Sequence, residues 1–137
     1  TGVQTCALPI LAAAGDTKVN ILGGLGGVFL IEELMAGAAG VMTGFAFPEV
    51  LVKVVSLWKA GKTQEAADAF YPFVALMRFE FQEGIGMAIR KEVLRRRGAL
   101  ADGSTRAPGP VLDEHTRKTL DSVLAWTKKT SGADFLI

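Results

Sequence analysis

Two short apolar runs, separated by a glycine-rich loop and an amphipathic stretch, dominate the first third of the chain. The runs Val19–Leu22 and Val41–Phe45 lack the alternation of a half-exposed strand, and both are followed or flanked by glycine. Continuous apolar runs of this length are typical of strands buried on both faces, as in a parallel sheet. About twenty residues separate the runs, enough for a helical crossover and too many for a hairpin. The pattern predicts two successive strand–helix units of an α/β protein.

The stretch between the two runs predicts an amphipathic helix. Its apolar side carries Phe29, Leu30, Leu34 and Met35. Glu32 and Glu33 lie on the other side, and adjacent helical positions point about 100° apart. Their carboxylates are therefore not expected to converge on one substrate, and we expect both residues on the outer surface or in an interface.

The remainder of the chain predicts helices. Pro48 and Glu49 suit a helix start, and Gly61 suits its end. Thr63 can cap the next helix, which Pro72 should kink by removing a backbone hydrogen bond. The apolar positions expected in these helices are Leu51, Val54, Val55, Trp58, Ala66, Phe70, Phe73, Met77 and Phe81.

Two further helices complete the pattern. The first runs from about Ile85 to Arg97 and closes at Gly98, and residues 101–110 form a loop by composition. Asp113 caps the last helix, which continues through Thr130. The inward positions of these helices are expected to be Ile85, Ile89, Val93, Leu120, Val123, Leu124 and Trp126. Residues 131–137 are expected to form a loose tail.

Several segments in order carry a family resemblance. They are GGLGG, EELMAGAAGVMTGFAFPEVLVKV, AFYPFVALMRFEFQ, GMAIRKEVLRRRGAL and TRAPGPVLDEHTRKTLDSVL, spanning roughly Val19 to Trp126. This order resembles the C-terminal portion of the dihydrodipicolinate synthase and N-acetylneuraminate lyase family of class I, Schiff-base aldolases. The resemblance implies an α/β fold: the last two strands of a (β/α)8 TIM barrel, followed by a helical C-terminal extension. It also implies a lyase that forms a lysine Schiff base with pyruvate or another 2-keto acid. Because no cysteine lies outside residues 1–10, we expect a cytoplasmic protein.

The length suggests a partial barrel. A complete barrel takes about 250 residues, whereas this chain has 137 and begins with Thr. We therefore expect a C-terminal fragment, with residues 11–62 forming the last two βα units and residues 63–137 the helical region. Residues 1–10, TGVQTCALPI, match the translated end of a sequencing adapter and are expected to be a foreign leader. The rival interpretation, a signal peptide, lacks a basic n-region.

A Schiff-base aldolase needs a lysine amine aimed at the keto carbon, at the C-terminal end of a barrel strand. The resemblance places that lysine on the sixth strand and the relay tyrosine further upstream, so we expect neither in this chain and no catalytic residue here. Lys18 precedes its strand, and Tyr71 falls on an outer helix. The other lysines are expected on outer helices or loops: Lys53, Lys59, Lys62, Lys91, Lys118, Lys128 and Lys129.

What remains of the site is the wall after the last two strands. We expect a substrate-binding set of Gly24, Gly26, Gly27, Met42 and Thr43, of which the resemblance implies Gly24, Met42 and Thr43. Glycines allow backbone to approach a ligand closely, so valine at Gly27 is expected to weaken substrate binding while leaving the fold largely intact. Two structural alternatives stay open: the glycines form tight βα turns, and Met42 is a core residue. Acidic residues that hold sugar hydroxyls in sialate-cleaving relatives are replaced by Leu25, Gly26 and Gly27, which favours a smaller or less polar substrate.

Composition adds mainly exclusions. The net charge of +1 gives no field that would favour nucleic acid, and Cys6, the one cysteine, lies in the expected leader. The longest uncharged runs have fifteen residues, short of a membrane span. We expect no metal and no cofactor, a small 2-keto acid as substrate, and a parent enzyme that is a dimer or tetramer. Arg95–Arg97 and His115 are expected on solvated helix faces, with Glu92 pairing Arg96.

Two other functions stay open. One is a phosphate-binding barrel, because that fold holds phosphate on the loops after its last strands, where GGLGG lies; no Lys, Ser or Thr follows the glycines as in a phosphate loop. The other is a non-enzymatic helical module that pairs through its aromatic stripe. A lysine at a strand end some tens of residues before Val19 would favour the aldolase over both.

Overall fold

A computed structural model describes residues 10, 12–15, 17 and 19–135. Within this part of the chain, two compact units can be distinguished. The first comprises residues 1–43 and 48–70, and the second comprises residues 44–47 and 71–137. None of the described helices is long and apolar enough to cross a membrane.

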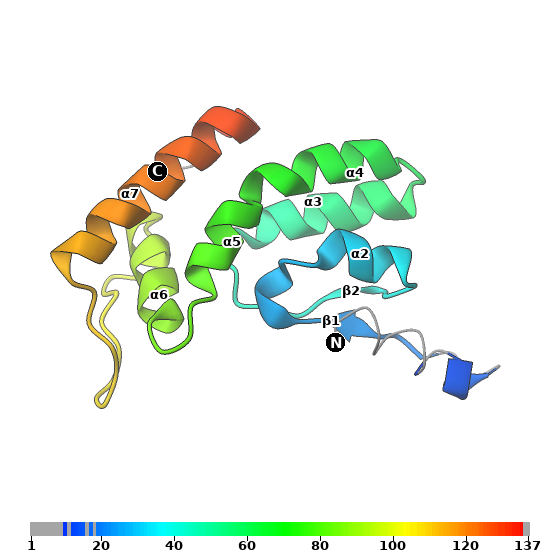
Figure 1. The fold of residues 1–137 in the computed structure, drawn as a ribbon, viewed down its shortest axis with the longest axis horizontal. Helices are drawn as coiled ribbons and strands as arrows, with labels where there is room; N and C mark the ends of the chain where they lie inside the picture. The colour runs from blue at the N-terminus through cyan, green and yellow to red at the C-terminus, as the bar shows by residue number, and fades with distance from the viewer. Residues whose placement is uncertain (1–9, 11, 16, 18, 136–137) are drawn as a thin grey trace. The chain divides into compact units, whose positions relative to one another are not determined.

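The first unit contains a parallel pair of strands joined by a helical crossover (Figure 1). Strand β1 (Leu22–Gly23) is followed by the short 3-10 helix η1 (Leu25–Gly27), helix α2 (Leu30–Met35) and strand β2 (Gly40–Val41). The paired residues are Leu22 with Gly40 and Gly23 with Val41. The predicted strand–helix–strand unit with parallel pairing is therefore confirmed for these residues.

Both strands are shorter than the apolar runs predicted, and the runs are not buried throughout. Val19 is 43% exposed and Met42 75% exposed, although Phe45 is buried. On the crossover helix, Leu30 and Leu34 are buried, whereas Met35 is 72% exposed. Burial on both faces requires neighbouring strands and a second helix layer, and within the described residues each strand has one partner. The apolar pattern thus exceeds what this part of the chain can cover.

Helices α3 (Pro48–Lys59) and α4 (Thr63–Phe70) lie side by side as a hairpin and complete the first unit (Figure 1). The start at Pro48 and the turn at Gly61, where φ is +76°, are as predicted. Helix α4 also contacts α2. This helix groups with the strands by contact, and the predicted division into barrel residues 11–62 and helical residues 63–137 stays a prediction.

The longer part of the second unit begins at Tyr71, next to Pro72. A 3-10 segment, η2 (Tyr71–Phe73), separates α4 from helix α5 (Val74–Glu80). Proline has no N–H to donate and its ring clashes with the preceding turn. The predicted kink is confirmed and takes the form of one tighter turn.

Helices α6 (Gly86–Arg96) and α7 (Glu114–Ser131) both pack against α5 (Figure 1). A carboxylate oxygen of Asp113 accepts a hydrogen bond of 2.7 Å from the Thr116 N–H, as its predicted capping role requires. The buried apolar residues of these helices include Leu76, Met77, Ile89, Val93, Leu120, Val123 and Leu124.

Three predictions about apolar side chains in this unit are wrong. Phe81 is 43% exposed and Trp126 is 64% exposed, although the sequence predicts both to be buried. The tail is not loose at Phe135, whose ring stacks on Phe73 with centroids 6.2 Å apart and contacts Phe47 at 5.9 Å. Aromatic pairs at such distances add to apolar burial.

Candidate active site

A tight turn follows strand β1. The backbone φ is positive at three successive residues, 51° at Leu25, 72° at Gly26 and 81° at Gly27. The Gly27 N–H donates a hydrogen bond of 2.8 Å to the Gly24 carbonyl oxygen. Glycine adopts this conformation freely, whereas Leu25 is an uncommon case for a residue with a side chain. Residues with such uncommon backbone angles are concentrated at ligand-binding loops. The same geometry also fits the alternative that these glycines only form a tight βα turn.

The end of strand β2 lies against this turn. The Met42 N–H donates to the Gly23 carbonyl oxygen at 2.9 Å. A Cβ atom added at Gly27 would lie 3.3 Å from Cγ2 of Thr43. The structure thus brings Gly27 and Thr43 together. The Met42 side chain is 75% exposed, so Met42 is not a core residue of this unit.

The Thr43 hydroxyl is the polar side-chain group of the predicted set. Its Oγ1 atom is buried and has no hydrogen-bond partner among the described residues. A buried hydroxyl without a partner costs free energy, and it can donate one hydrogen bond to an oxygen of a ligand. Because this hydroxyl lies beside the glycine turn, it can donate a hydrogen bond to a carboxylate or keto oxygen of a ligand bound there.

Glu33 lies beneath the glycine turn, and the prediction of an outer-surface position for it is wrong. Its side chain comes from α2 and is 1% exposed, and its Oε1 accepts a hydrogen bond of 3.4 Å from the Gly24 N–H. Burial raises the pKa of this carboxyl, the Gly24 hydrogen bond opposes the rise, and nearby Glu32 adds to it. A Cβ atom at Gly23 would lie 1.6 Å from Oε2 of Glu33. The pairing of Gly23 with an acid ten residues later on the crossover helix is the sequence signal that could have located this residue.

The described lysines lie where the sequence placed them. Lys53 and Lys59 are on α3, Lys91 is on α6, Lys62 is in the turn after α3, and α7 carries Lys118, Lys128 and Lys129. Lys18 and Cys6 fall outside the described residues. Tyr71 is 52% exposed in η2, and His115 is exposed in the first turn of α7. In the part of the chain that the structure describes, no cluster of three or more His, Cys, Asp or Glu could hold a metal ion.

Replacing Gly27 by valine is expected to destabilise the first unit. Gly27 is buried with φ at +81°, and a β-branched side chain at that angle costs about 1–3 kcal/mol in addition to crowding Thr43 and Leu51. The prediction that Gly27→Val leaves the fold largely intact is therefore replaced by an expected loss of stability. Thermal unfolding followed by circular dichroism measures the effect. Gly24→Ala is the matched control, because nothing lies within 4 Å of a Cβ at Gly24; equal melting temperatures for both variants would contradict the prediction.

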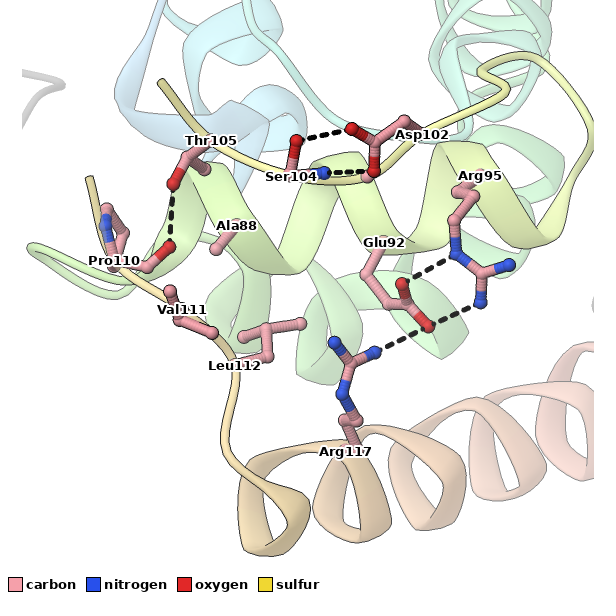
Figure 2. Close-up of a pocket in the computed structure, with 11 residues that line it drawn as sticks. Ala88, Glu92, Arg95, Asp102, Ser104, Thr105, Pro110, Val111, Leu112 and Arg117 are labelled. Carbon is pink, nitrogen blue, oxygen red and sulfur yellow. Dashed lines mark hydrogen bonds and ion pairs between the residues drawn. The ribbon is translucent and has the colours of Figure 1, made fainter. Parts of the chain in front are cut away.

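A separate cavity of about 330 Å³ lies in the second unit, between α6, the loop after it and the start of α7 (Figure 2). Its lining residues include Glu92, Arg95, Asp102, Ser104, Thr105 and Arg117. Ser104 donates to Asp102, and the Thr105 hydroxyl donates to the Pro110 carbonyl oxygen at 2.7 Å. The polar groups drawn in Figure 2 bond to one another in three separate sets, around Glu92, between Asp102 and Ser104, and between Thr105 and Pro110.

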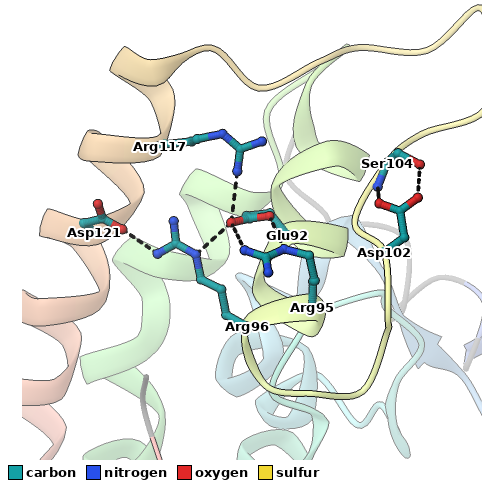
Figure 3. A network of polar contacts seen from close by, with 7 residues as sticks. All are labelled: Glu92, Arg95, Arg96, Asp102, Ser104, Arg117 and Asp121. Atoms are coloured by element: carbon teal, nitrogen blue, oxygen red, sulfur yellow. Dashed lines mark hydrogen bonds and ion pairs between the residues drawn. The ribbon is translucent and has the colours of Figure 1, made fainter.

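Glu92 is the centre of a group of ion pairs with Arg95, Arg96 and Arg117 (Figure 3). Its carboxylate accepts from Arg95 and Arg96 at 2.9 Å each and from Arg117 at 3.0 Å, and Arg96 also pairs with Asp121. The predicted pairing of Glu92 with Arg96 is confirmed, but Glu92 is 4% exposed rather than on a solvated face. Hydrogen bonds from Arg95, and then from Arg96 and Arg117, lower the pKa of this carboxyl to about 2, against the effect of burial. These contacts fasten α7 to α6.

Comparison with known proteins yields one curated relative and one solved structure of particular use, while no family model matches the chain. L-2-keto-3-deoxyarabonate dehydratase of Azospirillum brasilense is 28% identical over 111 residues, which are 81% of this chain and 36% of the relative. The crystal structure of dihydrodipicolinate synthase from Rhodopseudomonas palustris superposes with a TM-score of 0.81 at 38% identity, covering 90% of this chain and 41% of that one.

Parallel strands joined by a helical crossover, with a glycine turn at a strand end, define an α/β fold, and the solved structure that the chain matches is a dihydrodipicolinate synthase. The expected resemblance is confirmed: the chain is similar to proteins of the dihydrodipicolinate synthase family, in which both matched proteins fall. The chain spans about two fifths or less of the length of the proteins it matches, a share that fits a C-terminal portion.

Proposed function

We propose that this chain supplies the C-terminal part of a lyase that forms a lysine Schiff base with pyruvate or another 2-keto acid. In this proposal, β1 and β2 are the last two strands of a (β/α)8 barrel, and the helices from α4 onward form its C-terminal extension. The catalytic lysine and the relay tyrosine belong to the part of the barrel that precedes this chain. The full-length parent is a dimer or tetramer.

In such a site the chain's own role is to bind the carboxylate of the keto acid. The Thr43 hydroxyl donates a hydrogen bond to that carboxylate, and such a bond is strong because the acceptor is charged. The N–H groups of Gly24, Gly27 and Met42 already donate within the chain. Binding the carboxylate here holds the adjacent keto carbon in place for attack by an amine from another strand. Orientation of this kind is a large part of the rate enhancement in two-reactant steps.

One observation carries the proposal: the buried hydroxyl of Thr43, without a partner among the described residues, lies beside a positive-φ glycine turn at the ends of two parallel strands. Ligands of barrel enzymes bind at the carboxyl ends of the strands. The likeness to a dihydrodipicolinate synthase at 38% identity supports the same placement.

A second reaction is favoured by the curated relative. That protein is named as a dehydratase of a 2-keto-3-deoxy sugar acid. Elimination of water from such an acid and cleavage or formation of a C–C bond both use the electron sink of the same imine. The turn Leu25–Gly27 carries no polar side chain for sugar hydroxyls, so C–C bond chemistry on a smaller keto acid remains our first candidate.

The full-length parent is expected to form a covalent adduct with pyruvate that sodium borohydride reduces to a stable secondary amine. This 137-residue chain alone is expected to form none, since its described lysines lie on helices and in a turn. Intact-mass spectrometry before and after reduction measures the adduct. Parent protein incubated with borohydride but no pyruvate is the control. A reduced adduct on the 137-residue chain, or none on the parent with any 2-keto acid tested, would overturn the proposal.

A further inference from the structure

The short segment Gly44–Phe47 belongs to no helix or strand, and its last three residues are buried. Phe45, Ala46 and Phe47 are exposed by 5%, 1% and 0%, and the two phenylalanine rings lie 5.7 Å apart. Buried peptide groups outside regular structure need other hydrogen-bond partners. This segment directly follows Met42 and Thr43 in the chain.

The side chains of Glu80 and Arg97 form hydrogen bonds with the peptide groups of Ala46. The Ala46 N–H donates to Oε2 of Glu80, at the end of α5, over 3.0 Å. Arg97, the residue after α6, donates through Nη1 to the Ala46 carbonyl oxygen. The Arg97 guanidinium also lies 4.4 Å from the ring centroid of Phe47, a favourable cation–π distance.

Glu80 occupies this position at an electrostatic cost. It is 2% exposed, and its Oε1 has no hydrogen-bond partner among the described residues. Burial raises the pKa of the carboxyl to about 8, although the Ala46 hydrogen bond and the charges of Arg90 and Arg97 act in the other direction. An apolar side chain could fill the same space at lower cost. What Glu80 adds is direction, because its oxygen fixes the orientation of one peptide.

We propose that Glu80 and Arg97 are positioning residues, which hold the Ala46 peptide and thereby fix the backbone of the candidate carboxylate-binding residues Met42 and Thr43. The proposal rests on the proposed function, since it gives these two residues a role in binding the keto acid. Neither Glu80 nor Arg97 touches the substrate in this scheme.

The kinetic test uses the full-length parent carrying Glu80→Ala, Glu80→Gln or Arg97→Met. Glutamine keeps an oxygen that accepts from the Ala46 N–H, whereas alanine does not. We expect Glu80→Ala and Arg97→Met to raise KM for the keto acid about tenfold with kcat changed less than about twofold, and Glu80→Gln to stay near the parent. The control is Glu83→Ala, which removes an exposed carboxylate three residues away. An unchanged KM in folded Glu80→Ala and Arg97→Met variants would overturn the proposal.

A second measurement does not depend on activity. Amide hydrogen exchange of Ala46 in the 137-residue chain is expected to accelerate at least about tenfold in Glu80→Ala but not in Glu80→Gln or Glu83→Ala. If the parent forms no keto-acid adduct, the proposed function fails, and this exchange pattern still decides whether Glu80 holds the segment. Equal Ala46 exchange in all three variants would overturn the positioning role even where KM changes.

Discussion

Gly86→Ala is expected to destabilise the second unit by about 2–3 kcal/mol. A Cβ atom at Gly86 would lie 2.4 Å from the Glu80 carbonyl oxygen, and a backbone atom cannot swing aside as a side-chain end can. Helix propensity alone predicts the opposite sign, because alanine is favoured over glycine in a helix by up to about 1 kcal/mol. The close approach of α6 to the end of α5 therefore decides the outcome.

Urea unfolding followed by circular dichroism measures this difference. Met87→Ala is the matched control, since Met87 is the next residue along α6 and is 55% exposed. We expect less than about 0.5 kcal/mol for that variant. A Gly86→Ala variant more stable than the unsubstituted chain would show that helix propensity outweighs the contact with the Glu80 carbonyl oxygen.

The second large effect is expected from Glu92→Ala. The substitution leaves three arginines, Arg95, Arg96 and Arg117, close together without the carboxylate that binds them all. Removing one member of a buried charge network costs about 3–5 kcal/mol. The arginine side chains are exposed by 45%, 23% and 42%, so solvent screening reduces the expected loss to about 2–3 kcal/mol.

The pH dependence gives an independent check on Glu92. Its pKa is lowered from 4.5 to about 2, so its contribution is complete above pH 4.5 and is lost as the pH falls towards 2. The unfolding free energy of the unsubstituted chain should therefore fall more steeply over this pH range than that of the Glu92→Gln variant. Glu114→Ala, which removes the exposed partner of Lys118, is the control and should behave as the unsubstituted chain. Identical slopes for the unsubstituted chain and Glu92→Gln would contradict the assigned role.

The sequence predicted the elements whose boundaries depend on local chemistry. Pro48, Gly61, Pro72 and Asp113 each act through their own backbone or side chain, and each marks the expected boundary. The parallel pairing was also predictable, because a crossover of this length leaves few alternatives.

The buried acids could not be predicted in the same way. Glu33, Glu80 and Glu92 are buried, whereas glutamate residues are ordinarily exposed. Their burial depends on partners distant in sequence, such as Ala46 for Glu80 at a separation of 34 residues. Of the candidate site, the sequence indicated the glycines and Thr43, while Glu33 beneath the turn became evident only from the tertiary structure.

The assignment of Gly44–Phe47 to the second unit has an evolutionary consequence. The polypeptide enters that unit once for these four residues, returns to the first unit for α3 and α4, and leaves again after Phe70. A recombination event at a single point cannot exchange the C-terminal helices, because Phe45 and Phe47 would be separated from the side chains selected to enclose them. Grafting these helices between relatives must therefore transfer the segment Gly44–Phe47 as well. We expect substitutions in this segment and in residues 71–137 to be correlated among relatives.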